Sequence, residues 1–484
     1  MLVFVCLSAP ASAQRTWIEV RSPNFVVATD DGERAGRTLA WEFEQVKAGI
    51  TALAPWARFG GDGPVVILAP RDEDGLRALA PQYWERGQSG VGSVSSSGPD
   101  RHYIALRADL RDDQQPLANP YQTAYWSYAF GAITRGARRP LPLWLSGGLA
   151  GMMSNMLVRD RDIQVGRLPM SYMVRVNQRE RPLLSELLRV DRTSPWYLDE
   201  QRRLTFDAES AAFVHFLLFA EGGAARPRLD RFVQSVLSGT SAIDAAETVF
   251  GDANQLESAF SRHIARRSLE FTEVQGDASV RAEAFAARPL PLAESSAIRA
   301  GFHAVNGRPA EARARLSEAR NADPNNPASY EVEGVLLDIE RQSEGARAAY
   351  ARAVELGTGN FYAHFRLGQM ASALQTPEGR AQAEAAFERA VALSDTFVPA
   401  LLQLGGVRLS LRKIEAAITA YERAVTLDPS SSVSRRLLAT ALMQAGRTDA
   451  ARSEAEESAA LAQSPQDLEA ATQLLQRLQM PVGR

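Results

Sequence analysis

The sequence contains one cysteine and few histidines, and each shortage excludes a kind of chemistry. Cys6, the single cysteine among 484 residues, lies in an apolar run at the N-terminus, so the rest of the chain has no disulfide and no thiol nucleophile. No two histidines lie three or four residues apart, the spacing that places two imidazoles on one metal ion from a helix. The five histidines are His102, His215, His263, His303 and His364.

Long apolar runs and a strong net charge are also absent. Beyond the N-terminal run, no stretch is long and apolar enough to predict a transmembrane helix. The formal net charge is −3, so no overall basic field favours nucleic acid or an anionic membrane surface. A local cluster at Arg135, Arg138 and Arg139 is more simply a solvated helix end. The length and a hydrophobic content of 45% indicate a globular protein of about two to four domains.

Residues 1–13 are typical of an export signal. Leu2–Leu7 is a short apolar run, and Ala11-Ser12-Ala13 has the small-x-small pattern of a cleavage site before Gln14. A charged segment before the run is missing, which favours a start codon further upstream. A lipoprotein anchor at Cys6 is the weaker alternative, because bulky residues precede it. We therefore expect a periplasmic or secreted protein of a bacterial cell envelope.

Two segments of the N-terminal half match the frame of a zinc peptidase. They are Trp126-Ser127-Tyr128-Ala129-Phe130 and Leu141-Pro142-Leu143-Trp144-Leu145-Ser146-Gly147-Gly148-Leu149-Ala150. They resemble the peptidase-MA-like (gluzincin) family of bacterial envelope proteins, in which the segments read His-Glu-Tyr-x-His and Leu-Pro-x-Trp-Leu-x-Glu-Gly-Leu-Ala. The resemblance covers about half of the chain. It implies an α+β zincin-like domain over residues 14–274, with strands first, then the two motif helices, then a helical tail.

The four catalytic residues of that frame are missing. The two zinc-binding histidines correspond to Trp126 and Phe130, the general base to Ser127, and the third zinc ligand to Gly147. Two of these side chains have no ligand atom, glycine has no side chain, and a serine hydroxyl is no base near neutral pH. We therefore expect a pseudo-metallopeptidase without metal or cofactor. We also expect the two aromatic rings to refill the emptied site as buried core, with Gly147 leaving room for them.

Other routes to catalysis have little support in the sequence. His215 lies on an apolar helix predicted over residues 208–221, but no second histidine is placed to share a metal with it. We therefore expect a core or rim histidine. Ser146-Gly147-Gly148 lacks the glycine order of a nucleophile elbow, and no pair of carboxylates can be brought together from sequence alone.

The C-terminal half repeats with a period close to 34 residues. Five alanines recur at spacings of 34, 37, 34 and 34, and each is followed four residues later by a second repeated position. The alanines are Ala312, Ala346, Ala383, Ala417 and Ala451, and the second positions are Leu316, Tyr350, Phe387, Tyr421 and Ala455. This pattern resembles the tetratricopeptide repeat. It implies an all-α superhelix over residues 292–484, with a C-terminal capping helix, after a linker at residues 275–291.

Stacked helix pairs of this kind form a concave groove lined by the first helix of each pair. Helical spacing places Tyr362, Phe365 and Gln369 of the third unit and Arg436 of the fifth unit on that groove. An equally weighted alternative makes Phe365 a core residue and Arg436 a solvated one. A protein or peptide partner is expected at this surface, and no nucleic acid.

The sequence as a whole predicts an exported, non-catalytic protein-interaction scaffold. One alternative is an envelope hydrolase with an unrecognised site, which a catalytic pair elsewhere in the peptidase-like cleft would favour. A second alternative is a structural envelope component without a discrete ligand. The sequence leaves the partner and the oligomeric state open.

Overall fold

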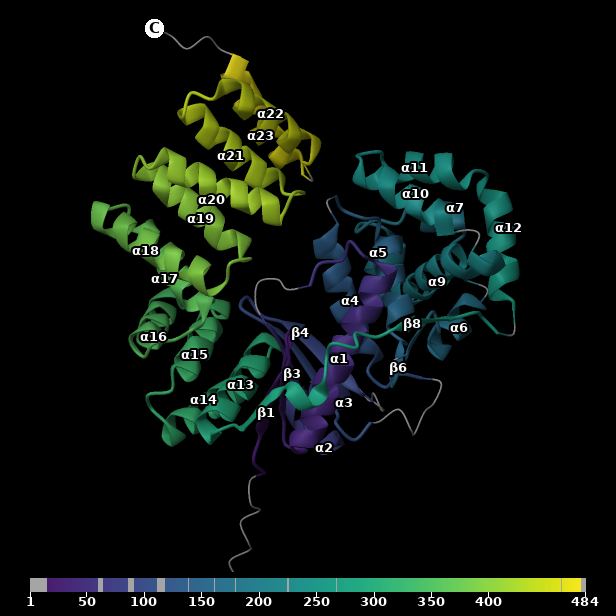
Figure 1. The fold of residues 1–484 in the computed structure, drawn as a ribbon, viewed down its shortest axis with the longest axis horizontal. Coiled ribbons are helices and arrows are strands. Elements are labelled where there is room, and N and C mark those ends of the chain that lie inside the picture. The colour runs from purple at the N-terminus through teal and green to yellow at the C-terminus, as the bar shows by residue number, and fades with distance from the viewer. Residues whose placement is uncertain are drawn as a thin grey trace, which may run out of the picture.

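The computed structural model describes residues 15–59, 64–85, 91–110, 118–137, 139–160, 162–178, 180–223, 226–266, 268–462 and 464–479. An α+β region comes first, and a curved array of helix pairs follows it (Figure 1). The predicted export signal lies outside the described residues. In the described ranges, no helix combines the length and the apolar character that crossing a membrane would need.

The first region is built on a mixed six-stranded sheet in the order β4-β5-β3-β2-β1-β9. Strands β2, β3 and β5 are parallel, and the other neighbours are antiparallel. The expectation that strands precede the two motif segments is confirmed, because β1 to β5 all lie before residue 107. The bounds are β1 Ile18–Arg21, β2 Phe25–Thr29, β3 Val65–Ala69, β4 Ser93–Ser97, β5 His102–Leu106 and β9 Ala286–Pro289.

Alternate residues of each strand supply two separate cores, because successive side chains point to opposite faces of a sheet. On one face, Val27 joins a core with α1 (Glu33–Leu53), α4 (Gln122–Gly136) and α5 (Leu143–Met153). On the other face, Ala28 joins a core with α2 (Glu73–Leu79) and α13 (Leu292–Val305), the first helix of the array. The sheet is therefore shared between the two regions.

Further helices and a small sheet complete the first region. The small sheet has the order β6-β7-β8. The helix α9 (Glu200–Phe219) runs against α5 and is buried along most of its length. The remaining elements are α3 Gln82–Glu85, β6 Leu157–Arg159, β7 Asp162–Val165, α6 Met170–Val176, α7 Leu184–Leu187, α8 Pro195–Leu198, α10 Arg226–Leu237, α11 Ala242–Phe250, α12 Ala253–Ile264 and β8 Thr272–Gln275.

The segment that we expected to be a linker, residues 275–291, is largely fixed against the first region. Strand β9 pairs with β1. The backbone oxygen of Asp277 accepts a hydrogen bond from the side-chain amide of Gln45, and the backbone N–H of Asp277 donates one to the side-chain oxygen of Gln45. Pro289 lies on the edge strand β9, where a missing N–H does not interrupt the sheet. The array thus begins directly from a strand of the sheet.

The array consists of five helix pairs and a terminal helix, as the repeat predicted. Within three pairs, a glycine of the first helix faces an aromatic ring of the second, and a Cβ at that glycine would lie closer than 3.0 Å to the ring. The pairs are α13 with α14 (Pro309–Ala322), α15 (Pro327–Ile339) with α16 (Ser343–Glu355), α17 (Phe361–Ala373) with α18 (Pro377–Leu393), α19 (Val398–Ser410) with α20 (Ile414–Leu427), and α21 (Ser432–Gln444) with α22 (Thr448–Ala460), followed by α23 (Pro465–Gln479).

The array returns to the first region beyond its first helix. Arg58 donates to the carbonyl of Leu427, the last residue of α20, at 2.5 Å. Arg139 donates to the carbonyl of Ala460, the last residue of α22, at 3.1 Å. Both guanidinium groups therefore cap helix C-termini, where unpaired carbonyls and the helix dipole favour a cation.

Candidate functional site

The three motif positions on α4, Trp126, Ser127 and Phe130, lie at the margin of the core and are partly buried. The rings of Trp126 and Phe130 stack with centroids 4.9 Å apart and an interplanar angle of 7°. Both rings are only partly buried, whereas Tyr125 and Ala129 are fully buried. Both rings pack against the core, but the expectation that they are buried within it is wrong. Helical periodicity assigns the core to positions 125, 128, 129, 132 and 133 instead.

Gly147, the fourth motif position, is buried on α5. A Cβ built at this position would have no neighbouring atom within 4 Å. The room expected beside Gly147 is therefore present, but the aromatic rings of α4 do not close onto it. The adjacent Gly148 differs, because its Cβ would overlap the backbone of Ser210 on α9.

A cleft of about 680 Å³ opens beside α4 and contains two of the motif positions, Ser127 and Phe130. We call it the α4 cleft. Its walls come from α4 and from the ends of strands β1 to β5. The charged or basic side chains on it are Arg21, Arg101, His102 and Arg135, and no described aspartate or glutamate lines it.

Two of the arginines on the α4 cleft are paired with carboxylates behind it. Arg21 binds Glu19 through two hydrogen bonds of 2.7 and 2.9 Å. Arg101 binds Asp100 at 2.7 Å and reaches Glu331 of the array at 3.4 Å. These two arginines therefore offer hydrogen-bond donors to the cleft, while their charges are compensated by the carboxylates that they bind.

A hydroxyl and an imidazole meet on the α4 cleft, a pair that the sequence did not predict. Ser97 Oγ lies 2.8 Å from His102 Nδ1, and the two residues are cross-strand partners in β4 and β5. Burial, and then the nearby Arg135, lower the pKa of His102 to about 4. His102 Nε2 is buried without a partner among the described residues. An imidazole with this pKa is a weak base near neutral pH, so the pair is poorly suited to activate the serine.

His215 is a core histidine, as expected, and its partner was not foreseen. Its Nδ1 lies 3.0 Å from His263 Nε2, and its Nε2 lies 2.8 Å from the backbone oxygen of Glu270. Burial lowers the pKa of both imidazoles to about 4. Sequence spacing could not reveal the pair, because it joins α9 to α12 across 48 positions. Throughout the described ranges, no three His, Cys, Asp or Glu side chains are grouped so that they could hold a metal ion.

The predicted groove residues of α17 have different environments. Phe365 is 7% exposed and packs against Phe387 and Phe397, so its placement on the groove is wrong and the core alternative holds. Tyr362 is partly buried beside the ring of Tyr350. Helical spacing fits an aromatic residue on the groove as well as one in the core, so the sequence could not decide between these two positions for Phe365.

An ion pair that the sequence analysis missed lies next to Gln369. Arg366 binds Asp338 of α15 through two hydrogen bonds of 2.7 Å each, and it also donates to Gln369 at 2.5 Å. These residues connect the first helices of the second and third pairs. Arg436 on α21 is partly buried, and its backbone oxygen accepts a hydrogen bond from Thr440.

A family profile described as tetratricopeptide repeat matches residues 303–361, 369–432 and 402–467. The helix pairs of the C-terminal region are tetratricopeptide repeats. All three matched ranges lie within the array. None of the curated proteins matches the chain.

Solved structures of other proteins resemble part of this chain at low overall scores. YrrB, titled a TPR protein with an unusual peptide-binding site, has a TM-score of 0.33 and 16% identity, and the likeness covers 37% of this chain and 92% of that one. MamA has a TM-score of 0.30, 20% identity and coverages of 40% and 98%. PilF of Pseudomonas aeruginosa has a TM-score of 0.31, 16% identity and coverages of 39% and 92%. Each likeness is confined to well under half of this chain.

Proposed function

We propose that the protein is an exported, non-catalytic scaffold that binds a protein or peptide through its tetratricopeptide array. The observation that carries the proposal is the five-pair array, a fold class used for protein and peptide binding. The first region serves in this proposal as a peptidase-like domain that has lost its catalytic residues. Its two motif segments lie on the neighbouring helices α4 and α5, beside a mixed sheet.

The proposed binding surface includes Tyr362, Gln369 and the ion pair of Arg366 with Asp338. These polar and aromatic groups occupy neighbouring first helices, which line the concave face of such an array. The α4 cleft is a second surface, and it offers hydrogen-bond donors to an extended segment. Export follows from the N-terminal pattern, and the mass of a processed protein beginning at Gln14 tests it.

Affinity capture from a bacterial envelope extract tests the scaffold proposal. The full chain is compared with Gln369→Ala, with Ser127→Ala, and with Arg313→Gln as a matched control on the exposed side of α14. We expect a partner that the wild type and the control retain and that Gln369→Ala reduces. Equal capture by all variants would locate recognition elsewhere, and loss with Ser127→Ala alone would assign it to the α4 cleft.

The pair of Ser97 and His102 supports a second candidate function, a hydrolase that uses the α4 cleft. The observation in its favour is the 2.8 Å contact between hydroxyl and imidazole. Labelling with a fluorophosphonate probe tests it directly. Labelling that Ser97→Ala abolishes would establish the hydrolase, and an unlabelled wild type would leave the scaffold as the better proposal.

A further inference from the structure

One arginine of the tetratricopeptide array has no carboxylate partner. The first helices of the five pairs carry five arginines, and four of them lie within 3.8 Å of a carboxylate oxygen. These four are Arg299, Arg366, Arg408 and Arg435. The fifth is Arg436 on α21, which is partly buried. Its guanidinium forms no ion pair and no hydrogen bond within the described part of the chain.

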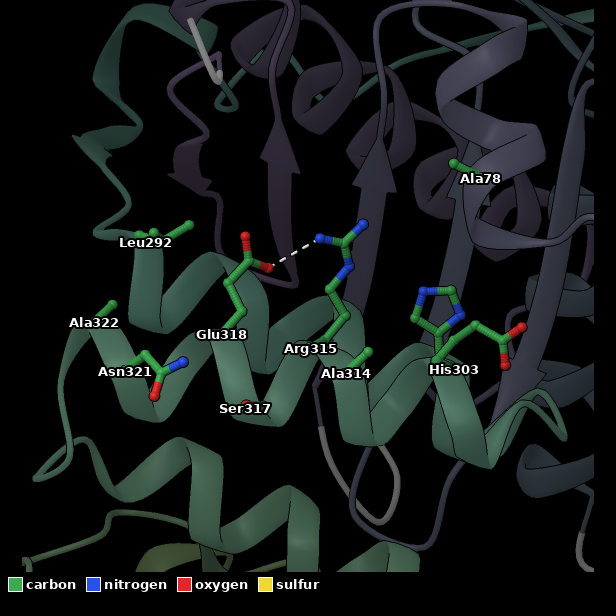
Figure 2. A pocket seen from close by; sticks show the side chains of 10 residues that line it. Ala78, Leu292, His303, Ala314, Arg315, Ser317, Glu318, Asn321 and Ala322 are labelled. Atoms are coloured by element: carbon green, nitrogen blue, oxygen red, sulfur yellow. Dashed lines mark hydrogen bonds and ion pairs between the residues drawn. The ribbon is translucent and has the colours of Figure 1, made fainter. Parts of the chain in front are cut away.

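The near end of the array shows the usual, compensated state of an arginine in this protein. A groove of about 750 Å³ lies there between α2, α13 and α14, and the arginine on it is Arg315 (Figure 2). Arg315 donates to Glu318 at 2.9 Å, the contact that Figure 2 marks. Glu311 adds a second carboxylate to the lining. This groove therefore contains its own counter-charge, which the surroundings of Arg436 lack.

The second and third pairs contain a complete arrangement of tyrosine, carboxylate and arginine. The hydroxyl of Tyr350 donates to Asp338 at 2.8 Å. Arg366, on the next first helix, binds the same carboxylate through two hydrogen bonds of 2.7 Å each. The ring of Tyr350 packs on Gly334, four residues before Asp338. One carboxylate thus satisfies a hydroxyl and a guanidinium that come from two different pairs.

The fourth and fifth pairs contain the same arrangement without the carboxylate. The ring of Tyr421 packs on Gly405, at the spacing that also separates Tyr350 from its glycine. Four residues after Gly405 stands Leu409, at the position that Asp338 has in the second pair. Tyr421 is 1% exposed, and its hydroxyl makes no hydrogen bond with the described residues. A buried hydroxyl without a partner is costly, so this one is available to a ligand.

The charge that acts on the Tyr421 hydroxyl is positive. Burial raises the pKa of Tyr421 to about 12, and the guanidinium of Arg436 opposes this rise. No carboxylate of the described residues acts on this hydroxyl; Glu422, the next residue, is exposed and is not among the groups that do. Arg435 adds no free charge, because it is paired with Glu454 at 2.8 Å. The positive charge of Arg436 therefore remains without a counter-charge.

The face around this tyrosine and arginine is open and otherwise aliphatic. Gly406 is exposed, and a Cβ at this position would lie 3.7 Å from the Tyr421 hydroxyl, so the missing side chain leaves the hydroxyl uncovered. Four aliphatic residues share this side of α19 and α21 at helical spacing from Gly406 and Arg436, and each is at least partly exposed. They are Leu402, Leu409, Val433 and Met443.

We propose that this face binds an acidic side chain of a partner peptide, an aspartate or glutamate with aliphatic neighbours, through Tyr421 and Arg436. The carboxylate of the ligand takes the place that Asp338 has in the second pair, and it accepts hydrogen bonds from the hydroxyl and the guanidinium. Its aliphatic neighbours pack on the apolar side chains of α19 and α21. This site rests on the peptide binding proposed above for the array, and it gives the partner a chemical class.

Selection from a displayed library of random peptides against the full chain tests the site. We expect the enriched peptides to carry an aspartate or glutamate beside leucine, isoleucine or valine, and we expect Arg436→Gln to lose this acidic preference. Enriched peptides without an acidic residue would overturn the site while leaving the scaffold function in place. A wild-type chain that enriches no peptide would contradict both.

Fluorescence anisotropy of the most enriched peptide then measures the contribution of each group. Arg436→Gln should weaken binding about tenfold, the effect of losing a charge-assisted hydrogen bond. Tyr421→Phe should weaken it about threefold. Arg452→Gln, which removes an exposed ion pair on α22, should leave binding unchanged. Equal weakening by Arg436→Gln and Arg452→Gln would show general charge screening and would overturn the site.

Two substitutions at Leu409 separate the carboxylate from the apolar contact. Leu409→Asp supplies from within the chain the carboxylate that the site lacks, so it should compete with the peptide and weaken binding by about tenfold or more. Leu409→Asn has nearly the same shape without the charge and should retain most of the binding. Thermal unfolding checks that both variants fold. Equal weakening by the two variants would show the loss of an apolar contact alone and would overturn the site.

Discussion

Asn360 of the tetratricopeptide array donates a hydrogen bond of 2.9 Å to Asp100, which lies 260 positions earlier in the chain. The same amide nitrogen donates to Glu331 at 3.0 Å, and Arg101 lies between the two carboxylates. Asp100 and Glu331 are 5% and 8% exposed. Two buried carboxylates from different regions therefore share one guanidinium and one amide, and Glu331 also accepts a hydrogen bond from Thr358.

Arg101→Met should destabilise the protein by about 3–5 kcal/mol, the usual effect of leaving buried carboxylates without their cation. The matched control is Arg189→Met, because Arg189 and Glu247 form an exposed ion pair whose loss should change stability by about 0–1 kcal/mol. Urea unfolding at neutral pH measures both values. Equal stability of the two variants would contradict the role of Arg101 in joining the regions.

Gly405→Ala should destabilise the array by about 1–3 kcal/mol through overpacking, because the new Cβ would lie 2.5 Å from the ring of Tyr421. The neighbouring Gly406→Ala is the control. Its Cβ would meet only the hydroxyl of Tyr421 at 3.7 Å, an ordinary contact, so helix propensity should make it neutral or stabilising by about 1 kcal/mol. Thermal unfolding of the two variants separates these outcomes, and a harmless Gly405→Ala would contradict the packing.

Acid should destabilise the fold through the pair of His215 and His263. Their folded pKa values of about 4 lie below the ordinary value of 6.5, so the unfolded chain binds more protons between these limits. Stability from this pair is complete above about pH 6.5 and falls as the pH drops toward about 4. Unfolding in urea at a series of pH values should show this fall, and His263→Gln should make it shallower. An unchanged slope would contradict the assignment.

Restoring the zinc ligands tests the peptidase-like frame. The variant that combines Trp126→His, Ser127→Glu, Phe130→His and Gly147→Glu should bind about one Zn²⁺ per chain, because the ligands would come from neighbouring helices with room at position 147. The triple variant that keeps Gly147 should bind more weakly. Isothermal titration with zinc measures both. A quadruple variant that folds without binding zinc would count against the frame.

The sequence predicted the repeats well because their spacing is a local property. In each pair from α15 to α20, a glycine of the first helix packs against an aromatic ring of the second helix, and this combination recurs with every pair. The first strands of the sheet were also predictable from short apolar runs. The repeats and the first strands depend on contacts between residues a few tens of positions apart, and such contacts leave a regular pattern in the sequence.

Contacts between distant segments could not be predicted. Phe130 and Phe365 have the same side chain, yet Phe130 lines the α4 cleft and Phe365 lies in the core. The bond between Asn360 and Asp100 has no periodic signature at all. Strand β9 was missed for the same reason, because its pairing with β1 joins the two ends of the first region.

The hydrogen bonds from Arg58 and Arg139 to the ends of α20 and α22 attach the array to the first region at a second place. A repeat array attached at one end only can bend along its length, whereas this array is also attached near its far end. Both far contacts are exposed, and exposed bonds of this kind contribute little individually. We therefore expect thermal or mechanical opening to begin at the far end of the array, because its near end is fixed by the packing of α13 on the sheet.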